Sequence, residues 1–215
     1  MPPEQLYRIP DSLSSEQAVM TEPLANIVHL YRIGAFPPFA RLAIVGAGTM
    51  GALSLLCGLR LGARDVLVVD VNDQRLATVA AMGAANAINV STPEGAGKAK
   101  ELAGFGFDVV LDASGNEAAR QMAFDLCRPG GQVILLGMAS LSSKLDFVTS
   151  IRKEHRVVMT FAYTPIDFEN SLSLMAAGAI DLSAYTAFYP LEDGQAAFNL
   201  AAFAPGETLK VLLTI

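Results

Sequence analysis

Three glycines at a fixed spacing are the residues of this sequence with the clearest chemical use. They follow a β-type apolar run, Arg41–Val45, and an apolar helical run to about Leu61 comes after them. In that context one glycine permits a tight turn, the next lets a phosphate approach the backbone, and the third lets the helix pack close to the strand. The helix N-terminus would then attract an anion, whereas the alternative is a purely structural glycine turn. The segment consists of Gly46, Ala47, Gly48, Thr49, Met50 and Gly51.

An acidic residue ends the next apolar run. Asp70 stands nineteen residues after Gly51, at the end of the expected strand 66–70. A carboxylate there can accept hydrogen bonds from both hydroxyls of an adenosine ribose and would repel a 2′-phosphate, so the sequence favours NAD over NADP. Arg75 either reaches the ribose or remains in solvent. The alternative for Asp70 is a carboxylate that only caps the end of the strand.

Two turns of small residues follow later strands. Ser114 and Gly115 come directly after the expected strand 108–112, and Gly137 and Met138 come after the expected strand 132–136. Ligands of doubly wound sheets lie at the carboxyl ends of the strands, so both turns are placed to line a cofactor cleft. Small residues there leave room for a ribose or a nicotinamide. The alternative is that these residues only serve tight turns.

The elements that would position these residues alternate along the chain. Continuously apolar β-runs separated by helical runs predict a parallel sheet covered on both faces, and therefore an α/β, doubly wound (Rossmann) fold. A turn is expected at 129–131. Residues 1–25, with one helical start, and 161–215 are expected not to continue the alternation, which leaves 26–160 as the nucleotide-binding domain. Further strands are expected at 87–90 and 157–160, helices at 73–82, 93–103, 116–127, 168–177 and 192–202, and a final β-run at 209–215.

Composition excludes several classes of protein. Apolar residues make up 52% of the 215 residues, charged residues 17%, and the net charge is −6. The apolar content favours a buried sheet. The negative net charge provides no basic surface to which nucleic acid or an anionic membrane would bind. No apolar run has the ~18 residues that span a bilayer, and with two cysteines and two histidines we find no zinc site of this chain's own. We expect a cytoplasmic protein.

Motifs spread over nearly the whole chain carry a resemblance to a known family. The sequence resembles the zinc-type medium-chain alcohol and polyol dehydrogenases, especially the sorbitol, threonine and sugar-alcohol branch. Each motif is modest alone, but their order is specific to that family. The matching segments are 9–14, 22–24, 45–51, 62–63, 69–70, 82–84, 112–115, 128–131 and 209–211.

The resemblance implies a role for each candidate residue. The loop from Gly46 to Gly51 would hold the pyrophosphate of NAD, and Asp70 with Arg75 would hold the adenosine ribose. Two turns would line the rest of the cofactor, Ser114 with Gly115 and Gly137 with Met138. Glu22 matches a glutamate near the catalytic zinc, which it binds directly or through water. The alternative for Glu22 is a carboxylate at a helix N-terminus, where the helix dipole favours it.

The sequence also departs from the family. The catalytic barrel that supplies the zinc ligands and most of the substrate pocket precedes the point where this chain starts, so zinc is expected only in a full-length relative. Residues 1–25 and 161–215 would be the lead-in from that barrel and the return to it. The family often has Arg or Cys where Ala162 stands in Phe-Ala-Tyr, which puts substrate contacts there in doubt.

Two functions follow as hypotheses. The first is the NAD-binding part of an alcohol or polyol dehydrogenase, inactive alone, in which hydride would pass between a secondary alcohol and NAD. The second is a non-catalytic NAD(H)-binding module, or a subunit that joins a separate partner chain, because the apolar run 209–215 would leave an open edge. Segment 144–165 lies where related dehydrogenases pair their subunits, so we expect a homodimer.

Overall fold

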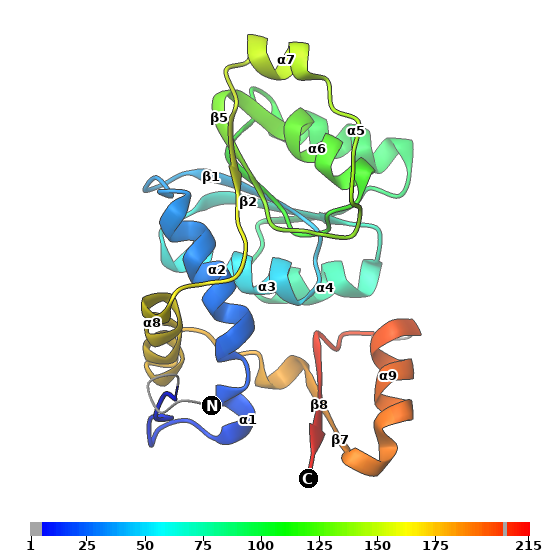
Figure 1. The fold of residues 1–215 in the computed structure, drawn as a ribbon. Helices are drawn as coiled ribbons and strands as arrows, with labels where there is room; N and C mark the ends of the chain where they lie inside the picture. Colours follow the sequence, from blue (N-terminus) through cyan, green and yellow to red (C-terminus); the bar gives the residue numbers. More distant parts are fainter. Residues whose placement is uncertain (1–5, 204–205) are drawn as a thin grey trace. The chain divides into compact units, whose positions relative to one another are not determined.

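A six-stranded parallel sheet organises the larger part of the chain (Figure 1). The computed structural model describes residues 6–203 and 206–215, and the chain divides into two compact units: Leu30–Phe161, and the segments before and after it. The strand order is β3-β2-β1-β4-β5-β6, and the predicted α/β doubly wound fold is confirmed. The strands are β1 (Arg41–Val45), β2 (Arg64–Asp70), β3 (Asn86–Asn89), β4 (Phe107–Asp112), β5 (Cys127–Leu135) and β6 (Arg156–Met159).

Helices cover both faces of this sheet, which is why its central strands are apolar throughout. In β1, Leu42 and Ile44 point to one face and Ala43 and Val45 to the other, and all four are at most 4% exposed. Figure 1 shows α3 and α4 on one face and α5 and α6 on the other. These helices are α3 (Thr49–Arg60), α4 (Asp73–Ala81), α5 (Pro93–Ala103) and α6 (Glu117–Leu126).

The strand order reverses between β1 and β4. From β1 the chain proceeds outward through β2 to β3, and from β4 it proceeds in the opposite direction through β5 to β6. The connections after β1 and β4 therefore lead to helices on opposite faces. A crevice opens between the first residues of these two connections.

Side chains just before the helices fix where each helix begins. Asn72 accepts hydrogen bonds from the amides of Gln74 and Arg75 before α4, and Thr92 accepts one from Gly95 before α5. Asn116 accepts one from the amide of Ala119 before α6. These are the residue types that satisfy the unpaired N–H groups of a helix N-terminus.

Residues 129–131, predicted as a turn, lie inside β5. Phe107 of β4 pairs with Cys127, but Val109 pairs with Gln132, so β5 has extra residues over this stretch. Gly130, with a φ of +66°, lets the bulge form. The turn chemistry is therefore present, but within a strand rather than before one.

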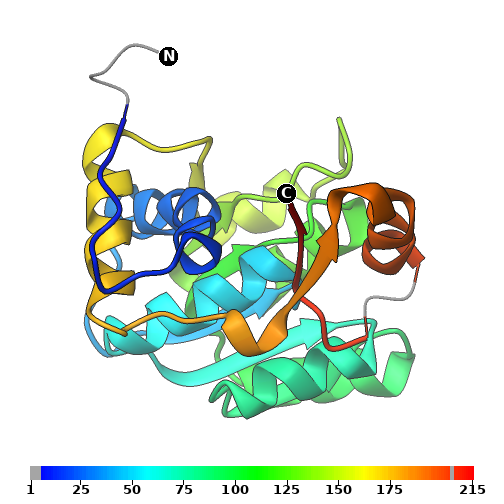
Figure 2. The ribbon, with the colours of Figure 1, turned by 90° about the horizontal axis from the view of Figure 1, so that it is seen from below.

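The other unit contains a second, smaller parallel sheet that the sequence pattern did not predict. Strand β7 (Thr186–Pro190) pairs in parallel with β8 (Lys210–Thr214), and α9 (Gly194–Phe203) connects them and packs on β8 (Figure 2). The C-terminal end therefore has a βαβ unit of its own, in a sheet separate from the six-stranded one. The same unit holds α1 (Ser15–Ala18) and α8 (Pro165–Ala176).

Helix α2 (Thr21–Ile33) spans the domain boundary that the sequence suggested at residue 26, and the two units divide at Leu30 instead.

In the described part of the chain, no helix combines the length and apolar character needed to cross a membrane.

Two glycines of α5 give opposite predictions for stability. A Cβ on Gly95 would lie 1.8 Å from the carbonyl oxygen of Asn89, whereas a Cβ on Gly97 would meet nothing within 4 Å. We expect Gly95→Ala to lower the free energy of unfolding by about 1–3 kcal/mol. Gly97→Ala should raise it by about 0.5–1 kcal/mol, because alanine favours the helix. Urea unfolding measures both, and equal stability of the two variants would contradict this packing of α5.

Candidate functional site

The first and last glycines of the loop after β1 are required by the protein's own packing. Gly46 has a φ of +110°, which only glycine adopts readily, and its amide donates to the carbonyl of Val69 at 2.8 Å. A Cβ on Gly51 would lie 1.9 Å from the carbonyl oxygen of Gly46. The first turn of α3 is thus pressed against the end of β1, as the spacing predicts.

The middle glycine has no such internal reason. Gly48 adopts φ −74°, which any residue tolerates, and a Cβ there would meet nothing within 4 Å. Gly48 is the N-cap of α3 and has no side chain to cap the first turn, which contains Thr49 and Met50. That turn has no acidic residue, whereas α4, α5 and α6 each have one. An open backbone and a positive helix end together suit an anionic ligand.

Asp70 ties the glycine loop to the end of β2. Its Oδ2 accepts a hydrogen bond from the amide of Ala47 at 2.6 Å, and its Oδ1 accepts from the amides of Val71 and Asn72 at 2.7 and 2.9 Å. Asp70 therefore does cap the end of β2, which was the alternative role considered for it. This role does not use up the carboxylate, because each oxygen has two lone pairs and Oδ2 has only one donor among the described residues.

Arg75 lies in the first turn of α4, and its amide is capped by Asn72. Within residues 6–203 and 206–215, its guanidinium makes no hydrogen bond or ion pair. The structure thus leaves both interpretations of Arg75, ribose contact and solvent exposure, open.

The turns after β4 and β5 cross at a very short distance. A Cβ on Gly137 would lie 2.1 Å from the amide nitrogen of Gly115, so both positions need glycine. Oδ1 of Asp112 accepts from the amides of Ser114 and Gly115 at 3.0 and 2.8 Å, which fixes the first turn. The amide of Gly137 donates to the carbonyl of Asp112 at 2.9 Å, which fixes the second.

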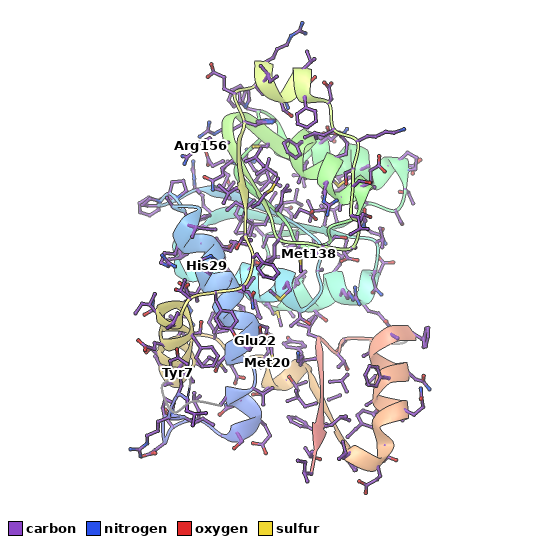
Figure 3. All side chains as sticks on the ribbon, viewed as in Figure 1. Tyr7, Met20, Glu22, His29, Met138 and Arg156 are labelled. Atoms are coloured by element: carbon purple, nitrogen blue, oxygen red, sulfur yellow. The ribbon has the colours of Figure 1, made fainter. Side chains whose placement is uncertain are left out.

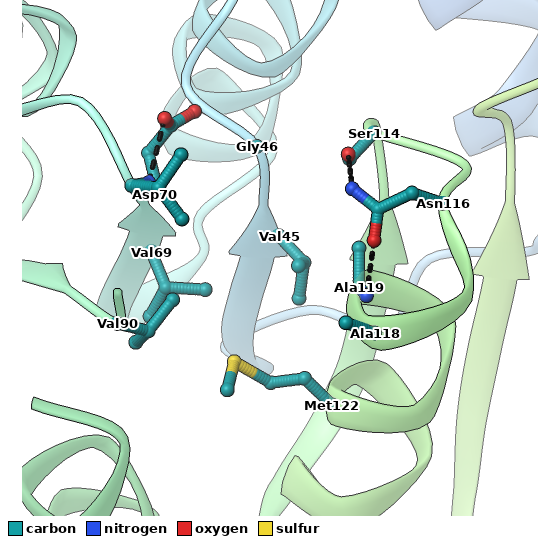
Figure 4. Close-up of a pocket in the computed structure, with 11 residues that line it drawn as sticks. Val45, Gly46, Val69, Asp70, Val90, Ser114, Asn116, Ala118, Ala119 and Met122 are labelled. Atoms are coloured by element: carbon teal, nitrogen blue, oxygen red, sulfur yellow. Dashed lines mark hydrogen bonds between the residues drawn. The ribbon is translucent and has the colours of Figure 1, made fainter. Parts of the chain in front are cut away.

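A cavity of about 140 Å³ opens at the point where the strand order reverses (Figure 4). Of the predicted residues, Gly46, Asp70 and Ser114 line it. Figure 4 shows Asp70 on one side and Ser114 with Asn116 on the other, with Asn116 donating to the Ser114 hydroxyl at 2.8 Å. The structure therefore brings the acid at the end of β2 and the turn after β4 to one cavity, as expected from the sequence.

Several lining residues were not predicted. The remaining wall of the cavity is mostly apolar or small, and it comes from the ends of β1, β2 and β3 and from α6. The one usable signal was Asn116, a helix-capping residue two positions after Ser114. The residues missed are Val45, Val69, Val71, Val90, Asn116, Ala118, Ala119 and Met122.

Gly137 and Met138 line a different and larger cavity, of about 540 Å³, between the segment after β5, α6 and β6. Met138 is 73% exposed. Gly48, Thr49, Met50, Gly51, Arg75 and Gly115 line neither cavity, although the glycine loop and Gly115 flank the smaller one in sequence.

Glu22 belongs to the other unit and sits in the first turn of α2 (Figure 3). Its Oε1 accepts from the side-chain amide of Asn26 at 3.2 Å. Burial, and then the charges of Glu22 and Tyr7, raise the pKa of Tyr163. On the same helix, Nδ1 of His29 lies 2.8 Å from Oδ2 of the buried Asp167.

The donor set does not fit a zinc ion. Over the described ranges, no three His, Cys, Asp or Glu side chains come together in a way that could hold a metal. Glu22 fits its alternative interpretation, a carboxylate favoured by the N-terminal end of a helix dipole.

Comparison with known proteins gives consistent relatives. Residues 40–177 match the family model described as "Zinc-binding dehydrogenase". A putative D-xylulose reductase of Rhizobium meliloti (strain 1021) is 31% identical over 207 residues, covering 95% of this chain and 60% of the relative. A sorbitol dehydrogenase of Macaca fascicularis is 29% identical, with 96% of this chain and 58% of the relative covered. The chain thus spans about 60% of the length of these relatives.

Solved structures show the same fold. L-idonate 5-dehydrogenase from Escherichia coli K-12 superposes with a TM-score of 0.88 at 26% identity, over 99% of this chain and 60% of the other. A short chain alcohol dehydrogenase from E. coli CFT073 complexed with NADH gives a TM-score of 0.92 at 22% identity, over 100% and 64%. A putative zinc-binding dehydrogenase from Sinorhizobium meliloti bound to NADP gives 0.88 at 22% identity, over 100% and 64%.

The loop supplies a matched pair of variants. Gly51→Ala places a Cβ 1.9 Å from the carbonyl oxygen of Gly46 and should lower the free energy of unfolding by about 1–3 kcal/mol. Gly48→Ala enters open space and should leave it within about 0.5 kcal/mol. Thermal or urea unfolding tests both. A destabilised Gly48→Ala would show that the loop is packed differently.

Proposed function

The chain belongs to the zinc-binding dehydrogenase family, and from this premise we propose that it is the NAD(H)-binding part of an alcohol or polyol dehydrogenase. NAD, when bound, would accept or return a hydride. The observation that carries the proposal is the Asp70 carboxylate, held by the amide of Ala47 at the edge of the cavity where the strand order reverses. The chain spans about 60% of the length of this relative. Activity of the whole enzyme on an alcohol is therefore proposed for this chain only together with the missing part.

Each element of the site has one task in this proposal. The amides at the start of α3, reached over the bare Gly48, bind the pyrophosphate. Asp70 accepts a ribose hydroxyl at the free lone pair of Oδ2, with Arg75 near enough in sequence to assist. Ser114 and Gly115 line the part of the cofactor beyond the pyrophosphate, and Gly137 and Met138 border its nicotinamide half.

A carboxylate at this place also determines which dinucleotide is preferred. NADP carries a 2′-phosphate where NAD has the hydroxyl, and its charge would face Asp70 directly. We therefore propose NAD rather than NADP as the cofactor.

A second candidate is a binding module that does not turn over, or a subunit completed by a separate chain. Within the described residues β8 pairs only with β7, and Leu213 and Ile215 are 41% and 116% exposed, so an apolar strand is left for a partner. Neither candidate predicts turnover by the chain alone. Oxidation of sorbitol by the purified 215-residue chain, dependent on added zinc and without any partner, would rule out the second candidate and would also contradict the expectation that the first is inactive alone.

A homodimer is also part of the proposal. Strand β6 forms one edge of the six-stranded sheet, and its Val157 and Met159 are 44% and 78% exposed. Cys57 and Cys127 are free, which suits the reducing cytoplasm that we propose as the location. Burial raises the pKa of each thiol to about 12, so both remain protonated and unreactive.

A substitution at Gly48 tests the pyrophosphate site. Gly48→Ala should weaken NADH binding by about tenfold or more, since one methyl group would hold the pyrophosphate off the amides that bind it. The unfolding free energy should stay unchanged. NADH fluorescence titration measures the affinity, and wild-type binding by this variant would place the pyrophosphate elsewhere.

The charge of Asp70 tests the choice of dinucleotide. Asp70→Asn keeps the size and an acceptor oxygen but removes the charge, so NADH binding should weaken while the preference for NADH over NADPH shrinks by about tenfold. Asp73→Asn is the matched control, because Asp73 is an acid three residues farther along the chain, at the start of α4, and does not line the cavity. An unchanged NADH/NADPH ratio in Asp70→Asn would remove Asp70 from the ribose site.

The dimer has its own test. Light scattering at micromolar concentration should give twice the 22.7 kDa mass of the chain. Val157→Lys should shift the protein toward monomer, because a lysine blocks pairing at an exposed strand edge. The control, Leu61→Lys, replaces a residue of similar exposure (49%) away from that edge. A wild-type monomer would refute the dimer.

A further inference from the structure

Arg120 connects a buried acid to the segment that follows β5. Its Nη1 donates to the hydroxyl of Ser143 at 2.7 Å, and its Nη2 donates to the carbonyls of Gly137 and Ser140 at 3.2 and 2.9 Å. Its Nε lies 3.7 Å from Oδ2 of Asp112. One side chain, fixed on α6, therefore holds three points of the segment 137–143.

Among the described residues, the acid behind Arg120 has no other partner on that side. Asp112 is completely buried, its Oδ1 is taken by two backbone amides, and its Oδ2 accepts no hydrogen bond among the described residues. Burial raises the pKa of the Asp112 carboxyl, and the two amides and Arg120 act against this shift. The Arg120 side chain is only 16% exposed, so the pair is weakly screened by solvent.

The segment held by Arg120 borders the turn after β4 as well. The amide of Ser140 donates to the carbonyl of Gly115 at 3.0 Å, and Gly137 crosses Gly115 so closely that neither position has room for a Cβ. Residues of this segment, with Arg120, line the 540 Å³ cavity. In the strand order, the carboxyl end of β5 lies farther from Asp70 than the cavity lined by Gly46, Asp70 and Ser114, where the proposed adenosine half would sit.

We propose that Arg120 is a positioning residue, which shapes the segment 137–143 for the nicotinamide half of the cofactor. This inference rests on the proposed NAD(H) binding. Arg120 acts through the groups that it holds, which are the carbonyls of Gly137 and Ser140 and the hydroxyl of Ser143. A lysine could keep the charge beside Asp112 but not the fork that reaches three acceptors.

Two probes separate this role from a general structural one. NADH contains the nicotinamide ring, and ADP-ribose lacks that ring but keeps the adenosine, the pyrophosphate and the second ribose. Arg120→Lys should weaken NADH binding by about tenfold, the loss typical of a broken hydrogen bond to a charged group. ADP-ribose binding, measured by calorimetry, should remain within about twofold of the wild type. A variant that is merely unstable would lose both ligands equally.

Ser143 allows the same test without changing any charge. Ser143→Ala removes the one acceptor that Nη1 has in the described part of the chain, and should produce a smaller loss of NADH affinity than Arg120→Lys, again with ADP-ribose unaffected. Ser91→Ala is the control, since Ser91 is exposed, lines neither cavity, and its side chain makes no hydrogen bond among the described residues.

Each combination of results has one meaning. If the wild-type chain binds neither NADH nor ADP-ribose, the proposed function fails and this inference fails with it. If the wild type binds both and Arg120→Lys binds both equally well, only the role of Arg120 is refuted. Equal losses for NADH and ADP-ribose in Arg120→Lys would also refute it, because they show a structural effect on the whole site.

Discussion

The reversal of strand order between β1 and β4 creates the candidate site. Because the chain leaves these neighbouring strands toward opposite faces, backbone cannot fill the space between their first turns. The cavity lined by Gly46, Asp70 and Ser114 lies at this place, and its floor is the apolar core beneath. A ligand with hydroxyl groups for Asp70 and an apolar part for the rest of the wall suits such a space.

Two carboxylates at strand ends give the turns their shape. Asp70 and Asp112 each accept two or more hydrogen bonds from backbone amides of the turns around them. They differ in what lies on the remaining side. Asp70 faces the cavity, whereas Asp112 is fully buried and faces Arg120. The first is therefore available to a ligand, and the second contributes by holding the protein itself in place.

Local patterns were enough to predict the sheet, the glycine loop and the acid at the end of β2, because each depends on neighbours in the sequence. The lining by Val90 and Met122 could not be predicted, since it depends on how α6 packs across β1 and on the pairing of β3 with β2. The strand at Thr186–Pro190 was missed because it is short and flanked by single helical turns. The contacts of Arg120 depend on the register between α6 and a segment about twenty residues away, which no local pattern encodes.

Backbone amide signals in NMR spectra give the most direct test of NAD(H) binding between the glycine loop and Asp70. Adding NADH should shift the amide signals of Gly48, Thr49 and Met50, where the pyrophosphate would sit, in a saturable way. The amide of Gly97, on the exposed side of α5, should not move. Shifts confined to other parts of the chain, or none at saturating NADH, would contradict binding at this loop.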